Sequence, residues 1–243
     1  IPRDRALSIY PEFYRPAFQY FFWPDSFAPM VHFGYIILLL LALLGLSNRV
    51  LMLVTWVIAQ GFINRNYSML FGADLISALF LFYMSFTQCH EKYTLRSLIF
   101  KKKVSLPHQE DSFSSQMSSV FFRLMQFQLA IIYMYTGFEK LKGSTWWDGT
   151  ALWTVFANPQ FVNYDLIFLR NFPLFFTIGT FVTLLFEVYF PAMMLFKAGR
   201  YAYLCLGVFF HLMIGVLLHL IPFSFIMIST YPLFLDKKDV QII

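Results

Sequence analysis

Lys140 lies where an apolar run of the sequence gives way to charged residues and tryptophans, within residues 133–151. An ammonium group that follows about twenty mostly apolar residues either reaches for the water interface or is held for chemistry. Burial among aromatic residues such as Trp147 would disfavour the charged form and leave a neutral amine, which is a good base. In the other interpretation, Glu139 and Asp148 keep the lysine charged and the tryptophans form an interface belt. Residue types alone favour this second interpretation, in which Lys140 is an interfacial anchor.

Five more ionisable residues lie inside apolar segments or, in the case of His219, directly after one, where such groups are functional candidates if they face the bundle or a wet cavity. They are Asp74, Arg123, Glu187, His211 and His219. Asp74 and Arg123 either serve a site or neutralise one another across helices. Glu187 either pairs with a lysine or arginine or holds a proton. His211 is a base, a hydrogen-bond donor to a quinone or a satisfied core histidine, and the core interpretation leads because the sequence shows no partner.

His90 follows the third apolar segment, and its neutral form could serve as a general base near the membrane surface, although a loop histidine is usually only solvated. Motifs of zinc hydrolases, phosphate-binding loops and serine hydrolases are absent from the sequence, so those chemistries have no support. The two cysteines, Cys89 and Cys205, cannot assemble a disulfide framework or a zinc site. No metal is therefore predicted.

The composition places these residues in a membrane. Hydrophobic residues make up 59% of the chain, aromatic residues 21% and charged residues 13%, with a mean hydropathy of +0.63. Too little polar surface remains to cover a soluble globule, so we predict an all-α, polytopic transmembrane helical bundle. The length suits about seven spans of roughly 20 residues, and hence a single domain over 1–243. The chain opens at Ile1 in a polar stretch, which suggests one more N-terminal span.

Seven apolar segments can be drawn, of which the second and the last are short. They are residues 31–48, 50–63, 69–88, 118–138, 173–196, 201–218 and 222–235. If every segment crosses, ten basic residues lie on one side and seven on the other, with Arg123 inside a segment. The richer side is predicted to be cytoplasmic, so the Lys140 loop faces the extracytoplasmic or luminal side. Basic loops of this kind explain the net charge of +5, and nucleic acid is not predicted as a partner.

Short segments and single residues with a recognisable pattern follow one another along almost the whole chain. They are residues 1–8, 66–72 with Asp74, His90, 123–128, 133–140, 147–151, Glu187, 210–211 and 232–234. In this order they resemble the vitamin K-dependent gamma-glutamyl carboxylase and its wider bacterial relatives, the HTTM membrane-domain proteins. Within the most recognisable block, Lys140 matches the catalytic lysine of the family. His90 falls where the carboxylase has a histidine implicated in its active site.

The resemblance implies an enzyme that couples epoxidation of a reduced naphthoquinone, the vitamin K quinol, to carboxylation of glutamate. Lys140 would deprotonate the quinol, and O2 would add to the anion to give a strong base that removes a gamma proton from glutamate. CO2 would trap the carbanion while the quinone leaves as its epoxide, with His90 assisting proton movement. A water-poor, aromatic-rich site suits this chemistry, because water would quench the base. The implied cofactor is reduced vitamin K, with O2 and CO2 as co-substrates.

The remaining polar landmarks are predicted to bind quinone or substrate or to be structural. They are Asn66, Asp74, Arg123, Trp147, Glu187 and His211. The implied partners are the lipid bilayer, a membrane quinone and a glutamate-containing protein or peptide. The rival prediction is a non-catalytic HTTM membrane module that binds lipid, quinone or a partner protein, with Lys140 as an interfacial anchor.

The sequence departs from the carboxylase at two points. The carboxylase carries a large luminal domain after its spans, whereas this chain ends at Ile243, so we expect no extracytoplasmic domain within it. In addition, the seven-segment count places His90 and Lys140 at opposite membrane faces. If both serve one site, segment 50–63 or segment 69–88 must be broken or only half-crossing.

Overall fold

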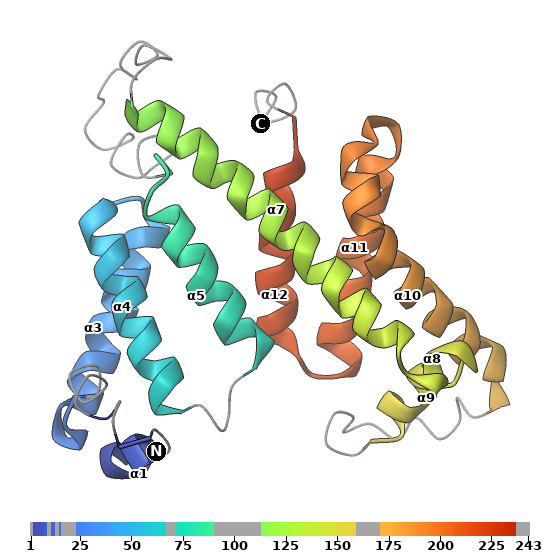
Figure 1. The fold of residues 1–243 in the computed structure, drawn as a ribbon, viewed down its shortest axis with the longest axis horizontal. Helices are drawn as coiled ribbons and strands as arrows, with labels where there is room; N and C mark the ends of the chain where they lie inside the picture. The colour runs from blue at the N-terminus through green and yellow to red at the C-terminus, as the bar shows by residue number, and fades with distance from the viewer. Residues whose placement is uncertain are drawn as a thin grey trace. The chain divides into compact units, whose positions relative to one another are not determined.

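The computed structural model describes residues 2–8, 11, 12, 15, 23–66, 71–89, 113–158 and 171–236, most of which are helical (Figure 1). No strand occurs in these ranges, so the predicted all-α class is confirmed. Backbone contacts divide the chain into two compact units, Ile1–Met125 and Gln126–Ile243. His90 lies outside the described residues.

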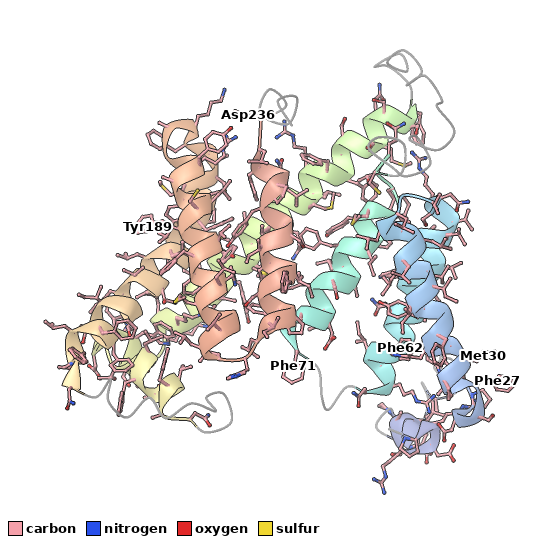
Figure 2. All side chains as sticks on the ribbon, turned by 180° about the vertical axis from the view of Figure 1, so that it is seen from behind. Phe27, Met30, Phe62, Phe71, Tyr189 and Asp236 are labelled. Carbon is pink, nitrogen blue, oxygen red and sulfur yellow. The ribbon has the colours of Figure 1, made fainter. Side chains whose placement is uncertain are left out.

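The first unit is built on three helices that follow one another along the chain. Its elements are α1 (Arg3–Ser8), η1 (Asp25–Phe27), α3 (Ala28–Leu43), α4 (Arg49–Arg65), α5 (Gly72–Met84) and the start of α7 (Phe113–Leu141). In Figure 1, α4 lies beside α3 and beside α5. Phe62 of α4, labelled in Figure 2, packs against His32 and Tyr35 of α3 with ring centroids 5.7 and 5.4 Å apart.

Short polar side chains and glycine set the ends of these helices. The apolar segment predicted over 31–48 stops earlier as a helix, because Gly45 adopts a left-handed φ of 67° just after α3. Asn48 then starts α4 by accepting a hydrogen bond from the backbone nitrogen of Leu51 at 2.9 Å. The Asp74 carboxylate accepts a bond from the nitrogen of Phe71 at 3.0 Å and so stabilises the start of α5.

The second unit begins in the middle of α7 and is organised around α10. Its further elements are α8 (Ser144–Trp147), α9 (Ala151–Phe156), α10 (Pro173–Leu195), α11 (Lys197–Leu217), α12 (Ile221–Thr230) and η4 (Tyr231–Phe234). Prolines open α10 and α12, where a fixed φ is compatible with the helix and no backbone N–H is required. Figure 1 shows α11 between α10 and α12 in order of the chain, with α8 and α9 beside the start of α10.

The core of the second unit is aromatic. Phe186 and Phe190 of α10 are fully buried, and both pack against Tyr133 of α7, with the Phe190 ring stacked at 4.1 Å. Phe186 also stacks on Tyr203 of α11 at 4.9 Å. These rings pack α7, α10 and α11 against one another, as expected for helices that meet in an apolar environment.

Each of the seven predicted apolar segments overlaps a helix. Among the described residues, four helices are long and apolar enough to cross a membrane: Asp25–Leu43, Phe113–Leu141, Pro173–Leu195 and Lys197–Leu217. Gly72–Phe86 and Ile221–Phe234 are apolar but shorter. α4, which corresponds to the predicted segment 50–63, carries Gln60, Asn64 and Arg65 in its second half, and these polar residues lower its hydropathy.

Candidate functional site

A close approach of two helices in the second unit positions the central pair of the site. A Cβ atom at Gly137 of α7 would lie 2.9 Å from Val188 Cγ2 and 3.0 Å from the Val188 backbone nitrogen on α10. Only glycine therefore allows the two backbones to come this close. One turn beyond Gly137 on the same face of α7 lies Lys140, and next to Val188 lies Glu187.

Lys140 and Glu187 form an ion pair. Lys140 Nζ donates to Glu187 Oε2 at 2.6 Å, and the exposed fractions of the two side chains are 24% and 9%. The Trp146 ring covers the ammonium, with its centroid 5.4 Å from Nζ. Thr136, one turn before Lys140, donates its hydroxyl to the Tyr133 carbonyl at 3.0 Å. The lysine is thus held by a carboxylate and an aromatic face rather than directed freely to water.

Pro191 adds a polar feature beside this pair. Proline has no N–H, so the Glu187 carbonyl, four residues earlier in α10, lacks its usual helical donor. The Tyr203 hydroxyl lies against the preceding carbonyls, 2.8 Å from the oxygen of Phe186 and 3.1 Å from that of Leu185. A side chain of α11 therefore donates to the backbone of α10 just before the glutamate, at the carbonyls of Leu185 and Phe186 rather than at that of Glu187.

The neighbouring lysine has a different environment. Lys142 Nζ donates to Glu139 Oε1 at 2.6 Å, and the Lys142 side chain is 69% exposed. The Glu139 carboxylate raises the pKa of Lys142 through this hydrogen bond and through its charge. Lys142 therefore stays protonated, and Glu139 is engaged by Lys142 rather than by Lys140.

A tryptophan turn closes the end of α7. Trp147 Nε1 donates to the Leu141 carbonyl at 2.8 Å, which caps the last turn of the helix, while the Trp147 ring itself is exposed. Gly149 follows with a φ of 73°, and a Cβ there would lie 2.7 Å from Thr177 Cγ2 of α10. This turn keeps Trp146 over Lys140 and leads the chain into α9.

A second polar cluster is buried in the same unit. Tyr133 Oη lies 2.6 Å from His211 Nε2 and 2.6 Å from Tyr231 Oη, and all three side chains are almost completely buried. Gly207 leaves room for the Tyr231 hydroxyl, because a Cβ at that position would lie 2.6 Å from it. His211 Nδ1 is buried and has no hydrogen-bond partner among the described residues. His211 thus has the core environment that was one of its predicted alternatives, with a tyrosine as its partner.

The other predicted residues lie in the first unit or at turns. Asn66 is half-buried just after α4, and Asp74 caps α5. Arg123 lies exposed on α7. His219 adopts a left-handed φ of 55° between α11 and α12. Within the described ranges, no three histidine, cysteine or acidic side chains are grouped to hold a metal ion.

The structure therefore brings together Lys140 and Glu187 of the predicted residues, with Trp147 closing the adjoining turn. Sequence analysis did not single out Gly137, Thr136 or Tyr231. The available signal for Gly137 was a glycine one turn before an unusual lysine in a long apolar helix. Tyr231 had no such signal, because it reaches Tyr133 from 98 residues away.

The arrangement can exchange a proton between an amine and a carboxylate at short distance in a partly dehydrated setting. The 2.6 Å contact is short even for a hydrogen bond between charged groups. A proton can therefore move from Lys140 Nζ to Glu187 Oε2 without a rearrangement of the two side chains.

The fold and this site define an all-α, multi-pass membrane protein with a lysine–glutamate pair at the end of a spanning helix. A family model described as HTTM domain matches residues 12–238, and the chain belongs to the HTTM domain family. The predicted membership in that family is confirmed.

One curated relative is the sporulation-delaying protein SdpB of Bacillus subtilis (strain 168). It is 29% identical to this chain over 127 residues, which make up 49% of this chain and 38% of SdpB. The chain therefore spans little more than a third of that relative. No solved structure matches the chain.

Proposed function

We propose that this HTTM-domain protein is a membrane enzyme in which Lys140 and Glu187 act as a proton-transfer pair on a reduced naphthoquinone, coupled to carboxylation of glutamate. The observation that carries the proposal is the 2.6 Å contact between Lys140 Nζ and Glu187 Oε2 at the end of α7. A lysine must lose its own proton before it can act as a base, and Glu187 is placed to receive it.

The first step moves one proton along this hydrogen bond. The N–H bond of the Lys140 ammonium breaks, an O–H bond forms at Glu187 Oε2, and both charges disappear. In water this transfer is strongly unfavourable, and partial burial of the pair removes part of the solvation that favours the two charges. The neutral amine of Lys140 then accepts the proton of a quinol hydroxyl.

The side chains around Lys140 fit such a substrate. Trp146 offers an aromatic face above the amine, and the turn that contains Trp147 covers the end of α7, so bulk water is restricted at the base. In this chemistry O2 would oxidise the reduced vitamin K to its epoxide, and CO2 would supply the carboxyl group. Lys140 is the residue that accepts the quinol proton. It can do so only after Glu187 has accepted the proton of the Lys140 ammonium.

A non-catalytic membrane module that binds lipid, quinone or a partner protein is the second candidate. The same contact favours it, because a lysine paired with a carboxylate is satisfied without any substrate and joins α7 to α10. In that case Lys140 stays an ammonium and acts as an anchor beside the tryptophans. The two functions differ in whether Lys140 has to lose a proton.

The test uses the purified protein in lipid nanodiscs with reduced vitamin K, O2, bicarbonate and a glutamate peptide. Quinone epoxide and carboxyglutamate are measured. We expect Lys140→Ala to lower the epoxide rate at least about 100-fold, the usual scale for loss of a general base. Lys142→Ala is the matched control, since this lysine is exposed and paired elsewhere, and its rate should equal that of wild type.

Two results would contradict the proposal in different ways. If the folded wild-type protein binds the quinol and forms no epoxide, the enzymatic function is refuted and the non-catalytic module is the remaining candidate. If wild type and Lys140→Ala form epoxide at the same rate, the protein is an enzyme but Lys140 is not its base.

A further inference from the structure

An apolar cavity lies between α9, α10 and α11, outside the lysine–glutamate pair. Its volume is about 210 Å³, and all of the described residues that line it belong to the second unit. Leu152 of α9 borders it at one side, Val182 and Phe186 of α10 at another, and Phe209 and Met213 of α11 at the third. Neither the proposed proton-transfer pair nor the His211 cluster accounts for this space.

The cavity follows from the way α9 docks on α10. A Cβ at Gly179 would lie 2.5 Å from Leu152 Cδ2, so glycine allows the first turn of α9 to sit directly on α10. The Leu152 backbone nitrogen donates to Thr180 Oγ1 at 3.0 Å and fixes this contact. α9 is only 6 residues long, whereas α10 has 23, so the groove between α10 and α11 continues beyond it.

The side chains that line the cavity favour an apolar ligand. Thr183 is the one polar side chain among the described residues that line the cavity, and none of them is charged. A quinol ring with two oxygen atoms would leave polar groups without partners there, at a cost in free energy. A hydrocarbon chain has no such requirement. The cavity is larger than the roughly 150 Å³ that accepts a benzene ring and smaller than the roughly 300 Å³ at which drug-sized sites begin.

The access route points to the bilayer as the source of the ligand. Val182 and Phe209 line the cavity and are 41% and 59% exposed, and each lies on a helix long and apolar enough to span the membrane. The exposed side of the cavity therefore opens among lipid chains. Because lipid tails are already apolar, a chain that enters gains close packing with the aromatic walls rather than hydrophobic transfer.

We propose that this cavity binds one acyl chain of a bilayer phospholipid. Phe186 separates the bound chain from the buried polar cluster, since its ring lines the cavity and also packs edge-on against Tyr133 at 5.4 Å. The site is thus a lipid-chain site that backs onto the polar core. It does not depend on the enzymatic function of Lys140.

The test uses the full chain in nanodiscs that contain phosphatidylethanolamine with a photoreactive diazirine midway along one acyl chain. After illumination, labelled peptides are mapped by mass spectrometry. We expect labels to concentrate on the cavity walls of α10 and α11, and Val182→Phe, which fills the cavity, to lower this labelling by about tenfold, or ~1.4 kcal/mol. Ile178→Phe is the control, because Ile178 is exposed on α10 but does not line the cavity.

Met213→Phe, which places a ring in the same space from α11, is a second variant in case Val182→Phe misfolds. The unfolding midpoint of each protein is also recorded. Equal labelling of wild type, Val182→Phe and Met213→Phe would overturn the proposal. So would an isoprenoid quinone that co-purifies with wild type and is lost from Val182→Phe, because the occupant would then be a quinone tail.

Discussion

The contact between α7 and α10 at Gly137 makes the position of Lys140 sensitive to a single methyl group. In Gly137→Ala, the new Cβ would meet Val188 Cγ2 at 2.9 Å, the Val188 nitrogen at 3.0 Å and the Glu187 carbonyl carbon at 3.2 Å. Two of these three atoms belong to the backbone, so a change of rotamer cannot relieve the clash. The helices have to separate, and the lysine–glutamate pair one turn away lengthens with them.

The magnitude follows from two opposing effects. Alanine in place of glycine in a helix interior stabilises by roughly 1 kcal/mol where there is space for it. Here the contacts fall about 0.2–0.5 Å short of ordinary van der Waals separation, and overpacking against a rigid neighbour costs about 1–3 kcal/mol. We therefore expect a net loss of up to about 2 kcal/mol in the free energy of unfolding.

The assay is reversible unfolding in mixed micelles of SDS and a mild detergent, followed by circular dichroism. Gly34→Ala in α3 is the matched control, because nothing lies within 4 Å of a Cβ there, and this variant should be as stable as wild type or up to about 1 kcal/mol more stable. If Gly137→Ala unfolds at the same SDS fraction as Gly34→Ala, the close approach of α7 and α10 is not a constraint, and the geometry derived for Lys140 fails.

Three further substitutions test other contacts by the same unfolding assay. Glu187→Gln leaves the half-buried Lys140 ammonium without its carboxylate and should cost about 1–3 kcal/mol, whereas Glu139→Gln at the exposed pair should change stability by less than about 0.5 kcal/mol. Tyr133→Phe removes two hydrogen bonds of 2.6 Å and leaves His211 Nε2 and the Tyr231 hydroxyl buried, for a loss of about 2–4 kcal/mol; Tyr135→Phe, at an exposed site, should be neutral. Asn48→Ala removes the side-chain cap of α4 and should cost about 1 kcal/mol. Equal stability of any variant and its control, or of Asn48→Ala and wild type, would show that the contact contributes nothing.

The helices could be predicted because they depend on local features of the chain. Apolar runs, short polar caps such as Asn48 and prolines in first turns each determine an element within a few residues. The early end of α3 could not be read from hydropathy, since the apolar residues continue past Gly45. Glycine interrupts the helix through its φ angle and not through its polarity.

The partner of Lys140 could not be predicted, because it depends on how two helices face one another. Glu139 is adjacent in sequence, but neighbouring residues on a helix point about 100° apart. Glu187 is 47 residues away and meets Lys140 only because Gly137 lets α10 approach. The Tyr133–His211–Tyr231 cluster was inaccessible for the same reason, since its members come from three elements.

The epoxide rate of Lys140→Arg tests the central claim most directly. Arginine keeps the positive charge and can pair with Glu187, but it does not give up its proton in proteins, so it preserves an anchor and abolishes a base. We predict that the variant unfolds within about 1 kcal/mol of wild type and forms epoxide from reduced vitamin K at least about 100-fold more slowly. A rate equal to that of wild type would contradict the account, because Lys140 would then act through its charge alone.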